Sequence, residues 1–171
     1  FTDYHRQYLE PTGMIQANVY RKQANKTVDK LMSILRSKHG GILIDKQKIL
    51  RQMITLRNEG KKIVYGLICD QKPRPEVARY WCDFLHHDTG FLDGGEVLSK
   101  KFGYPVLYAH IHSPKRGYYV VRFEVLAEHP KETAENEITA MYAKRLEANI
   151  LEQPQQWLWT HNRWKWGRIK V

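Results

Sequence analysis

A histidine and a carboxylate stand five positions apart near the start of the chain, at His5 and Glu10. A histidine base oriented by a nearby carboxylate can remove the proton of a hydroxyl during acyl transfer. The same spacing also arises by chance in a chain with eight histidines. His5 and Glu10 are therefore a candidate catalytic pair, with coincidence as the alternative.

Two further candidates, Asp70 and Arg36, lie at the ends of expected elements. Asp70 follows the nearly continuous apolar residues 62–69, which are typical of a parallel strand covered on both faces. Ligands of open α/β sheets bind beyond the carboxyl ends of the strands, so Asp70 is a site candidate. Capping of the next turn is the alternative for Asp70. Arg36 falls in the last turn of an expected helix, where the helix dipole alone also favours a cation.

Four of the five tryptophans lie within ten residues near the end of the sequence, among arginine, lysine and histidine. If this segment is helical, each residue advances by about 100°, which places Trp157 and Trp164 on one face and Trp159 and Trp166 nearly opposite. One pair would enter a core, while the other would suit a membrane interface or a phosphorylated ligand. A terminal helix docked through its tryptophans is the alternative.

The remaining polar clusters favour structural roles. Adjacent histidines in a strand point to opposite faces, and nothing near His86 and His87 completes a tetrahedral metal site. His110 and His112 share a face but lack an evident third ligand. The glycines at residues 94–95 precede a helix without the lysine of a phosphate-binding loop, which favours a tight helix entry. We expect no bound metal.

Size and composition predict one domain with one hydrophobic core, since the chain has 171 residues of which 42% are hydrophobic. A net charge of +10 favours acidic partners such as phosphates, anionic lipids or an acidic carrier protein. No apolar run approaches the roughly eighteen residues of a spanning helix. Cys69 and Cys82 lack the spacing of a redox motif, so a reducing compartment and two buried thiols are expected, with a disulfide as the alternative.

Periodicity predicts an alternation of strands and helices. The expected strands are residues 15–20, 42–44, 62–69, 80–85, 105–111 and 118–126. The expected helices begin after Asn25 and after Asp45, run from about 94 to 102, and form a long amphipathic helix over 138–150. Residues 105–111 and 118–126 should pair as an antiparallel hairpin in which Tyr119, Val121, Phe123 and Val125 share a face. The predicted fold class is α/β, with a mixed, mainly parallel sheet flanked by helices and an amphipathic C-terminal helix.

Several short motifs carry a family resemblance. They are Val19-Tyr20-Arg21, Arg36 fifteen residues later, Cys69-Asp70-Gln71, Phe84 with Thr89 through Gly95-Glu96, Lys115-Arg116-Gly117-Tyr118, and Gln156-Trp-Leu-Trp-x-His-x-Arg-Trp-Lys165. Over residues 19–165 the chain resembles the late acyltransferases of bacterial lipid A biosynthesis, particularly the variants of Bacteroidetes-like bacteria. The terminal tryptophan-rich signature is the most specific part of this resemblance.

The resemblance implies a glycerolipid-acyltransferase-like fold at the cytoplasmic face of the bacterial inner membrane. Such enzymes of lipopolysaccharide biosynthesis move an acyl chain from acyl carrier protein, or from acyl-coenzyme A, to a hydroxyl of a phosphorylated glycolipid, the lipid A precursor. A histidine base, oriented by an acidic residue five positions later, deprotonates the acceptor hydroxyl. No cofactor beyond the acyl donor is implied.

The resemblance also assigns roles to individual residues. Asp70 and Arg36 match family residues with supporting roles in catalysis. Arg21, Arg36 and Arg163 are the expected substrate-binding residues. Arg36 would hold a phosphate or carboxylate through its planar fork, and Asp70 would organise either Arg36 or a substrate hydroxyl.

Two features depart from the family pattern. The family's histidine motif normally reads His-aromatic-Gly-Asn-Trp-Glu and lies farther ahead of the Tyr-Arg segment than His5 lies ahead of Arg21. We therefore expect the true motif, with a hydrophobic anchor, to precede Phe1 in a longer enzyme of which this chain is the larger, C-terminal part. On this view the His5 and Glu10 spacing is a coincidence, and the chain alone is inactive. The second departure is Asn162, where the family often has another arginine.

A binding module without catalysis is the alternative function. Basic and aromatic side chains together also suit single-stranded nucleic acid or anionic lipid. The chain carries no recognised nucleic-acid-binding motif, so the leading hypothesis includes no nucleic-acid partner.

Overall fold

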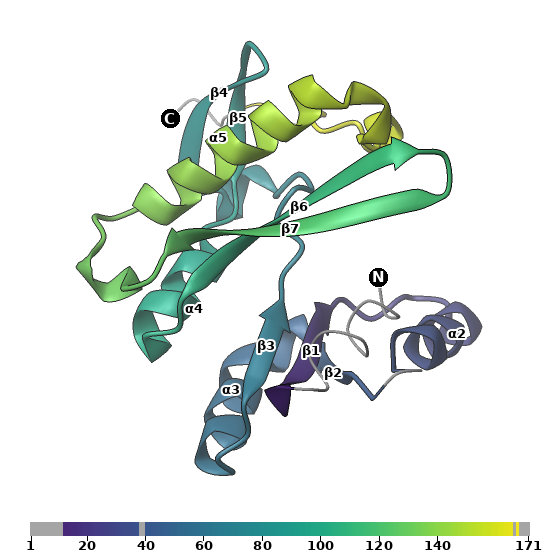
Figure 1. Cartoon of the computed structure of the whole chain (residues 1–171), viewed down its shortest axis with the longest axis vertical. Coiled ribbons are helices and arrows are strands. Elements are labelled where there is room, and N and C mark those ends of the chain that lie inside the picture. Colours follow the sequence, from purple (N-terminus) through teal and green to yellow (C-terminus); the bar gives the residue numbers. More distant parts are fainter. Residues whose placement is uncertain (1–11, 38–39, 166, 168–171) are drawn as a thin grey trace. The chain divides into compact units, whose positions relative to one another are not determined.

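The computed structural model describes residues 12–37, 40–165 and 167 of the chain. Its contacts divide the chain into two compact units, Phe1–Ile68 and Cys69–Val171, and each is considered by itself. Helices and strands alternate in both, which confirms the mixed α/β class (Figure 1). The expectation of one domain stays a prediction.

The first unit is a small parallel sheet with two helical connections. Its elements are β1 (Ile15–Tyr20), α2 (Lys26–Ser37), β2 (Ile42–Asp45), α3 (Ile49–Asn58) and β3 (Ile63–Gly66). β1 lies between β2 and β3, and both neighbours run parallel to it (Figure 1). Ala17, Ile44 and Leu56 form the buried centre of this unit. The predicted strand at residues 15–20 is confirmed.

Caps start the helical connections where the sequence predicts them. The Asn25 carboxamide oxygen accepts the N–H groups of Thr27 at 2.9 Å and Val28 at 3.2 Å, which satisfies two otherwise unpaired donors at the start of α2. Asp45 accepts the N–H of Gln47 and so caps the short 3-10 turn that leads into α3. The predicted cap at Asn25 is confirmed, whereas Asp45 caps this turn rather than α3, whose own N-cap residue Lys48 makes no side-chain cap hydrogen bond.

The strand expected over residues 62–69 is shorter than predicted and is not covered on both faces. β3 pairs only over Ile63–Gly66, and all four residues are partly exposed. The pairing ends where Gly66 lies opposite Asn18, and β1 is the only strand that β3 pairs with among the described residues. Leu67 and Ile68 continue the apolar run but are exposed.

The second unit contains two hairpins and two helices. Its elements are β4 (Tyr80–Phe84), β5 (His87–Phe91), α4 (Gly94–Phe102), β6 (Val106–Lys115), β7 (Tyr118–Ala127) and α5 (Glu137–Glu152). β4 pairs with β5 and β6 with β7, both antiparallel, in two separate two-stranded sheets. The predicted parallel and antiparallel pairings are thus both present, although in different sheets.

Helix α5 holds the second unit together. It lies along the β6–β7 hairpin and also contacts β4 (Figure 1). Its buried side chains include Ala143, Leu146 and Ile150, which join Phe84, Phe91 and Tyr108 in one hydrophobic cluster. The predicted amphipathic helix is confirmed, and it is this helix that sets the position of β4 and β5.

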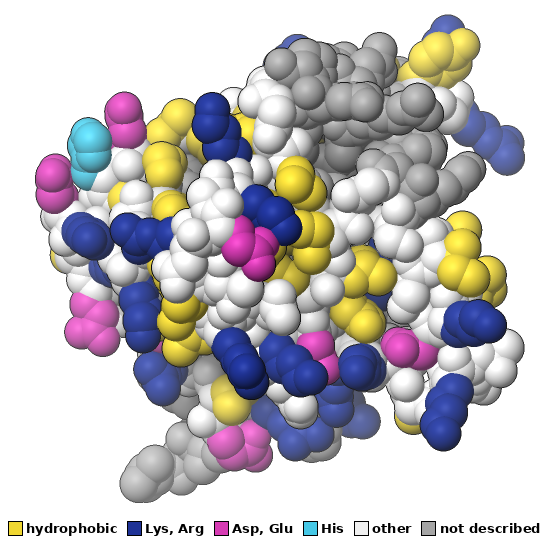
Figure 2. All heavy atoms as spheres, turned by 90° about the horizontal axis from the view of Figure 1, so that it is seen from below, with side chains coloured by type: hydrophobic (Ala, Val, Ile, Leu, Met, Phe, Trp, Pro, Cys, Tyr) yellow, Lys and Arg dark blue, Asp and Glu magenta, His cyan; other side chains and the backbone are white. Residues whose placement is uncertain are grey.

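The outer face of the β6–β7 hairpin is apolar and exposed. Phe123 and Val125 are 54% and 65% exposed, and Tyr119 lies on the same face. The predicted sharing of a face is therefore confirmed, but alternation alone does not tell which face is buried. Figure 2 shows exposed hydrophobic side chains interspersed with many Lys and Arg side chains.

Candidate functional site

The predicted site residues are distributed over both units. Arg21 and Arg36 belong to the first unit, and Asp70 and Arg163 belong to the second. His5 and Glu10 lie outside the described residues. The predicted pairing of Arg36 with Asp70 stays a hypothesis.

In the first unit, basic side chains gather at the carboxyl end of the parallel sheet. Tyr20 ends β1 and lies opposite Asp45, which ends β2. Arg21 and Lys22 follow β1 directly and are exposed. The guanidinium carbon of Arg36 lies 5.6 Å from the centre of the Tyr20 ring, a cation–π distance. This end of a parallel sheet is where α/β proteins bind ligands, and its charge here suits an anionic group.

Asp70 begins the loop of residues 70–75, which we call the Asp70 loop. Asp70 is partly buried in the second unit. Burial raises the pKa of Tyr142 well above its ordinary value, and the charge of Asp70 contributes in the same direction. Burial likewise raises the pKa of Tyr108 to about 12, again with a smaller contribution from Asp70. Burial is thus the main cause of both raised pKa values, and the charge of Asp70 is a minor one.

The tryptophan-rich terminal segment (residues 157–164) is not the helix that the spacing analysis assumed. It consists of short 3-10 turns, because Pro154 ends the regular backbone and Asn162 adopts the left-handed conformation at φ 50°. The expected sorting of side chains nevertheless holds where it is described. Trp157 and Trp164 pack on the hydrophobic cluster, and Trp159 is 52% exposed. Trp166 lies outside the described residues.

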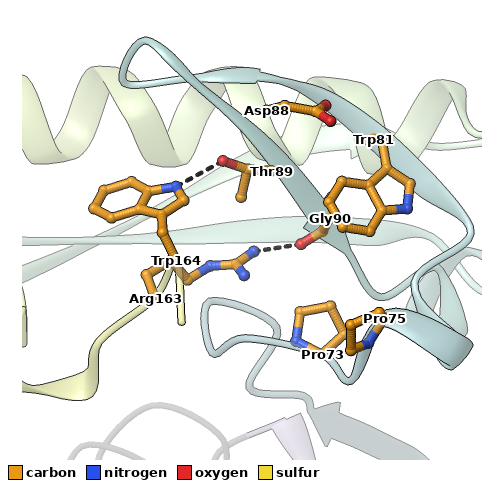
Figure 3. Close-up of a pocket in the computed structure, with 8 residues that line it drawn as sticks. All are labelled: Pro73, Pro75, Trp81, Asp88, Thr89, Gly90, Arg163 and Trp164. Carbon is orange, nitrogen blue, oxygen red and sulfur yellow. Dashed lines mark hydrogen bonds between the residues drawn. The ribbon is translucent and has the colours of Figure 1, made fainter. Parts of the chain in front are cut away.

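Arg163 is buried against the β4–β5 hairpin (Figure 3). One terminal nitrogen, Nη2, donates a hydrogen bond to the Gly90 carbonyl at 2.6 Å, and the guanidinium carbon lies 4.9 Å from the centre of the Phe91 ring. The residue is only 5% exposed, and burial lowers its pKa. Its Nε has no hydrogen-bond partner among the described residues. The carbonyl contact gives Arg163 a role in holding the terminal segment, in addition to the predicted substrate contact.

Trp164 makes the neighbouring contact on the same hairpin. Its indole N–H donates to the Thr89 hydroxyl at 2.8 Å, and its ring lies 4.5 Å from the ring of His87 (Figure 3). Arg163 and Trp164 thus dock on successive residues of β5. A small, shallow pocket, partly open to solvent, is lined by Pro73, Pro75, Trp81, Asp88, Thr89, Gly90, Arg163 and Trp164 (Figure 3).

Gly90 must be glycine for this contact to form. A Cβ at this position would lie 2.8 Å from the Cβ of Ala78 and 3.0 Å from the Trp81 ring, which is closer than real side chains approach. The hairpin backbone is therefore in direct contact with its neighbours. This close fit fixes the carbonyl that Arg163 binds.

Three of the histidines that we expected to be structural lie against protein groups. His110 Nε2 and His112 Nδ1 lie 3.5 and 3.3 Å from the carboxylate oxygens of Glu152 on α5, although His110 Nε2 makes no hydrogen bond within the described residues. The His87 ring lies at a tilt against the Trp164 ring. Within the described residues, no three His, Cys, Asp or Glu side chains gather as a metal ion would require. Cys69 and Cys82 form no disulfide with each other, and both are partly exposed, not buried as the sequence predicts.

Glu96 is the buried polar residue whose role the sequence analysis missed. One carboxylate oxygen accepts both the N–H and the hydroxyl of Thr139, at 2.9 and 2.6 Å, and the other accepts from Lys100 at 2.7 Å. Burial raises the pKa of Glu96, but the hydrogen bonds from Lys100 and Thr139 outweigh it, and the pKa is lowered. Glu96 therefore joins α4 to α5. The four-residue spacing between Glu96 and Lys100 is visible in the sequence and suits a pair on one helix face. The contact between Glu96 and Thr139 is not visible there, because the two residues belong to different helices.

A comparison with protein families supplies the identity. The family model described as bacterial lipid A biosynthesis acyltransferase matches residues 3–166. The chain belongs to this family. No curated protein sequence matches the chain. The match spans both units, so the basic end of β1 and the docked terminal segment are both parts of one lipid A acyltransferase region.

None of the helices in the described part of this family member combines the length and the apolar character needed to cross a bilayer.

Proposed function

We propose that this member of the lipid A acyltransferase family transfers a fatty acyl chain from acyl carrier protein to a hydroxyl of a phosphorylated lipid A precursor. Acyl-coenzyme A is the alternative donor, and no further cofactor takes part. The reaction takes place at the cytoplasmic face of the bacterial inner membrane. The observation that carries the proposal is the family match over residues 3–166, together with the basic residues at the carboxyl end of β1.

In this reaction the acceptor oxygen attacks the thioester carbonyl as its proton passes to a histidine base. The tetrahedral intermediate then collapses, the carbon–sulfur bond breaks, and the thiolate of the carrier leaves with the proton. His5 with Glu10 is the candidate base pair within this chain, and a histidine motif in a longer chain is the competing assignment. No covalent bond to the enzyme forms.

The basic residues provide the acceptor site in this proposal. Arg21 and Arg36 flank the carboxyl end of β1, where they bind a phosphate of the glycolipid. A planar guanidinium satisfies two phosphate oxygens at once, which a lysine does not. The net charge of +10 also favours approach of an acidic carrier protein and an anionic lipid surface.

The Asp70 carboxylate has the second role. Partly buried at the start of the Asp70 loop, it accepts a hydrogen bond from a substrate hydroxyl or orients the arginine that binds phosphate. Asp70→Asn keeps the shape but removes the charge. We expect this variant to lower kcat more than it raises KM.

An acyl-transfer assay tests the proposal. Full-length protein is incubated with acyl-acyl carrier protein and a lipid A precursor, and the acylated product is measured. Arg36→Ala should lower kcat/KM by roughly ten- to a hundredfold, since hydrogen bonds to charged groups contribute about 1.5–3 kcal/mol. Arg57→Ala is the matched control, because Arg57 occupies the last turn of α3 as Arg36 occupies that of α2.

Two results of this assay decide the proposal. Absence of acyl transfer by the full-length protein with either donor would refute it. His5→Ala separately tests the base: loss of activity assigns His5, and retained activity excludes it.

A further inference from the structure

The terminal segment contacts the loop that carries Asp70. The backbone N–H of Lys72 donates a hydrogen bond to His161 Nε2 at 3.0 Å, across 89 positions of sequence. The Lys72 ammonium group also reaches the carbonyl oxygen of Asn162 at 3.3 Å. Both bonds lie two residues after Asp70, so they fix the direction of the chain where it leaves that carboxylate.

The Asp70 loop has few other donors with which to anchor itself. Pro73 and Pro75 have no backbone N–H, and Pro73 restricts Lys72 to an extended conformation. Such a loop is stiff within itself but depends on outside contacts for its position. The Lys72 N–H is the backbone donor that connects this loop to His161.

The acceptor geometry defines the state of the histidine. To accept the Lys72 N–H, Nε2 must be the ring nitrogen that carries no proton. His161 is partly buried at the end of a short 3-10 turn. The next residue, Asn162, has φ 50°, a conformation that asparagine tolerates better than arginine. This backbone requirement gives a physical reason for asparagine at the position where an arginine was expected.

The terminal segment is itself held firmly. Arg163 and Trp164, the residues that follow, are hydrogen-bonded to Gly90 and Thr89 of β5. His161 is therefore connected to the rigid hairpin on one side and to the Asp70 loop on the other. Through these hydrogen bonds, the position of the β4–β5 hairpin determines the position of the Asp70 loop.

We infer that His161 is a positioning residue that holds the Asp70 loop in place for acyl transfer. The inference rests on the proposed function, because it assigns a role relative to Asp70. His161 touches neither the acceptor nor the thioester in this proposal. It acts through the Lys72 backbone.

Two substitutions at one position test the inference in the full-length protein. His161→Leu removes the acceptor, and His161→Gln returns an acceptor oxygen near the place of Nε2. Loss of one positioning bond should lower kcat roughly tenfold in His161→Leu, with the KM of both substrates nearly unchanged. His161→Gln should recover most of kcat. Trp159→Phe is the control, since Trp159 is exposed and its indole binds Pro154 rather than the loop.

Amide hydrogen exchange provides a readout that does not depend on activity. The Lys72 amide should exchange faster in His161→Leu and return to slow exchange in His161→Gln, while the amides of α5 keep their wild-type rates. A folded His161→Leu variant with wild-type kcat would overturn the inference, as would a His161→Gln variant that fails to recover kcat while it restores slow exchange.

The failure of the inference can be told from failure of the proposed function. An active wild-type enzyme that tolerates His161→Leu refutes only the positioning role. A wild-type enzyme without acyl transfer refutes the proposed function and the positioning role with it.

Discussion

The two basic regions of this chain use arginine in opposite ways. At the carboxyl end of β1, Arg21 is exposed and Arg36 is only partly covered by the Tyr20 ring. In the terminal segment, Arg163 is 95% buried and donates to a backbone carbonyl. The family motifs predict substrate binding for all three arginines, but these side chains differ in exposure and in their contacts. The arginines of the first region are accessible to the anionic ligand that we propose, whereas Arg163 holds the terminal segment on the β4–β5 hairpin.

The largest expected effect is a difference in the free energy of unfolding between variants of the two regions. Arg163→Ala leaves the Gly90 carbonyl without its donor and removes the packing on Phe91, so we expect unfolding to become easier by about 3 kcal/mol. Arg36→Ala should cost under about 0.5 kcal/mol, since its side chain lies at the surface. Urea unfolding followed by circular dichroism measures both. Equal losses for the two variants would contradict the comparison.

Tryptophan fluorescence refines this experiment. All five tryptophans lie after Cys69, so their emission reports on the second unit alone. The fluorescence transition should shift in Arg163→Ala and stay at its wild-type position in Arg36→Ala.

The next largest effect concerns Glu96, the buried carboxylate that joins α4 to α5 in the second unit. Glu96→Gln removes the charge that accepts from Lys100 and Thr139, and should cost about 2 kcal/mol at neutral pH. The folded pKa of Glu96 lies below the ordinary value of 4.5, so its contribution is present above that pH and is lost as the pH falls through the folded pKa. The stability difference between wild type and Glu96→Gln should therefore narrow on acidification. Urea unfolding at a series of pH values measures it, and a difference that widens toward acid would contradict the assignment.

A smaller effect tests whether Trp164 docks through its indole N–H. Trp164→Phe and Thr89→Val each remove one partner of the 2.8 Å hydrogen bond. A double-mutant cycle in urea should give a coupling of about 1 kcal/mol. Coupling near zero would mean that Trp164 contributes by packing alone.

The smallest effect is a gain in stability at the turn of the same hairpin. Leu85 and His86 connect β4 to β5 with φ values of 53° and 63°, where side chains cause strain. His86→Gly relieves about 1–2 kcal/mol of that strain but adds chain entropy, so we expect a net gain of about 0.5–1 kcal/mol. Thermal unfolding measures it, and His129→Gly is a control at an exposed histidine with φ −115°. A loss of stability in His86→Gly would show that the His86 side chain contributes contacts.

The first strand, the N-cap at Asn25 and the long amphipathic helix could be predicted because local patterns determine them. The β4–β5 hairpin could not be predicted from its turn, since Leu85 and His86 lack the glycine and asparagine that signal such turns. The packing of Trp157 and Trp164 on the core was predicted correctly, but from the assumption of a helix. The structure orients both side chains by turns and not by a helix.

The candidate site was less predictable than the fold. Arg36 and Asp70 stand out through their places beside expected elements, but the bond from Lys72 to His161 joins residues 89 positions apart. The same holds for Glu96 and Thr139, which are 43 positions apart. No local pattern encodes such pairs, because they exist only once the tertiary structure brings their elements together.

The contact between Gly90 and Arg163 also has a consequence for synthesis on the ribosome. These residues are 73 positions apart, so a ribosome that adds about 5–20 residues per second completes the hairpin roughly 4–15 s before it supplies the arginine. During that interval the nascent hairpin has no partner for the Gly90 carbonyl or the Thr89 hydroxyl from the terminal segment. The emerging chain thus passes through a stage in which the β4–β5 hairpin is complete but still lacks the cover of the terminal segment.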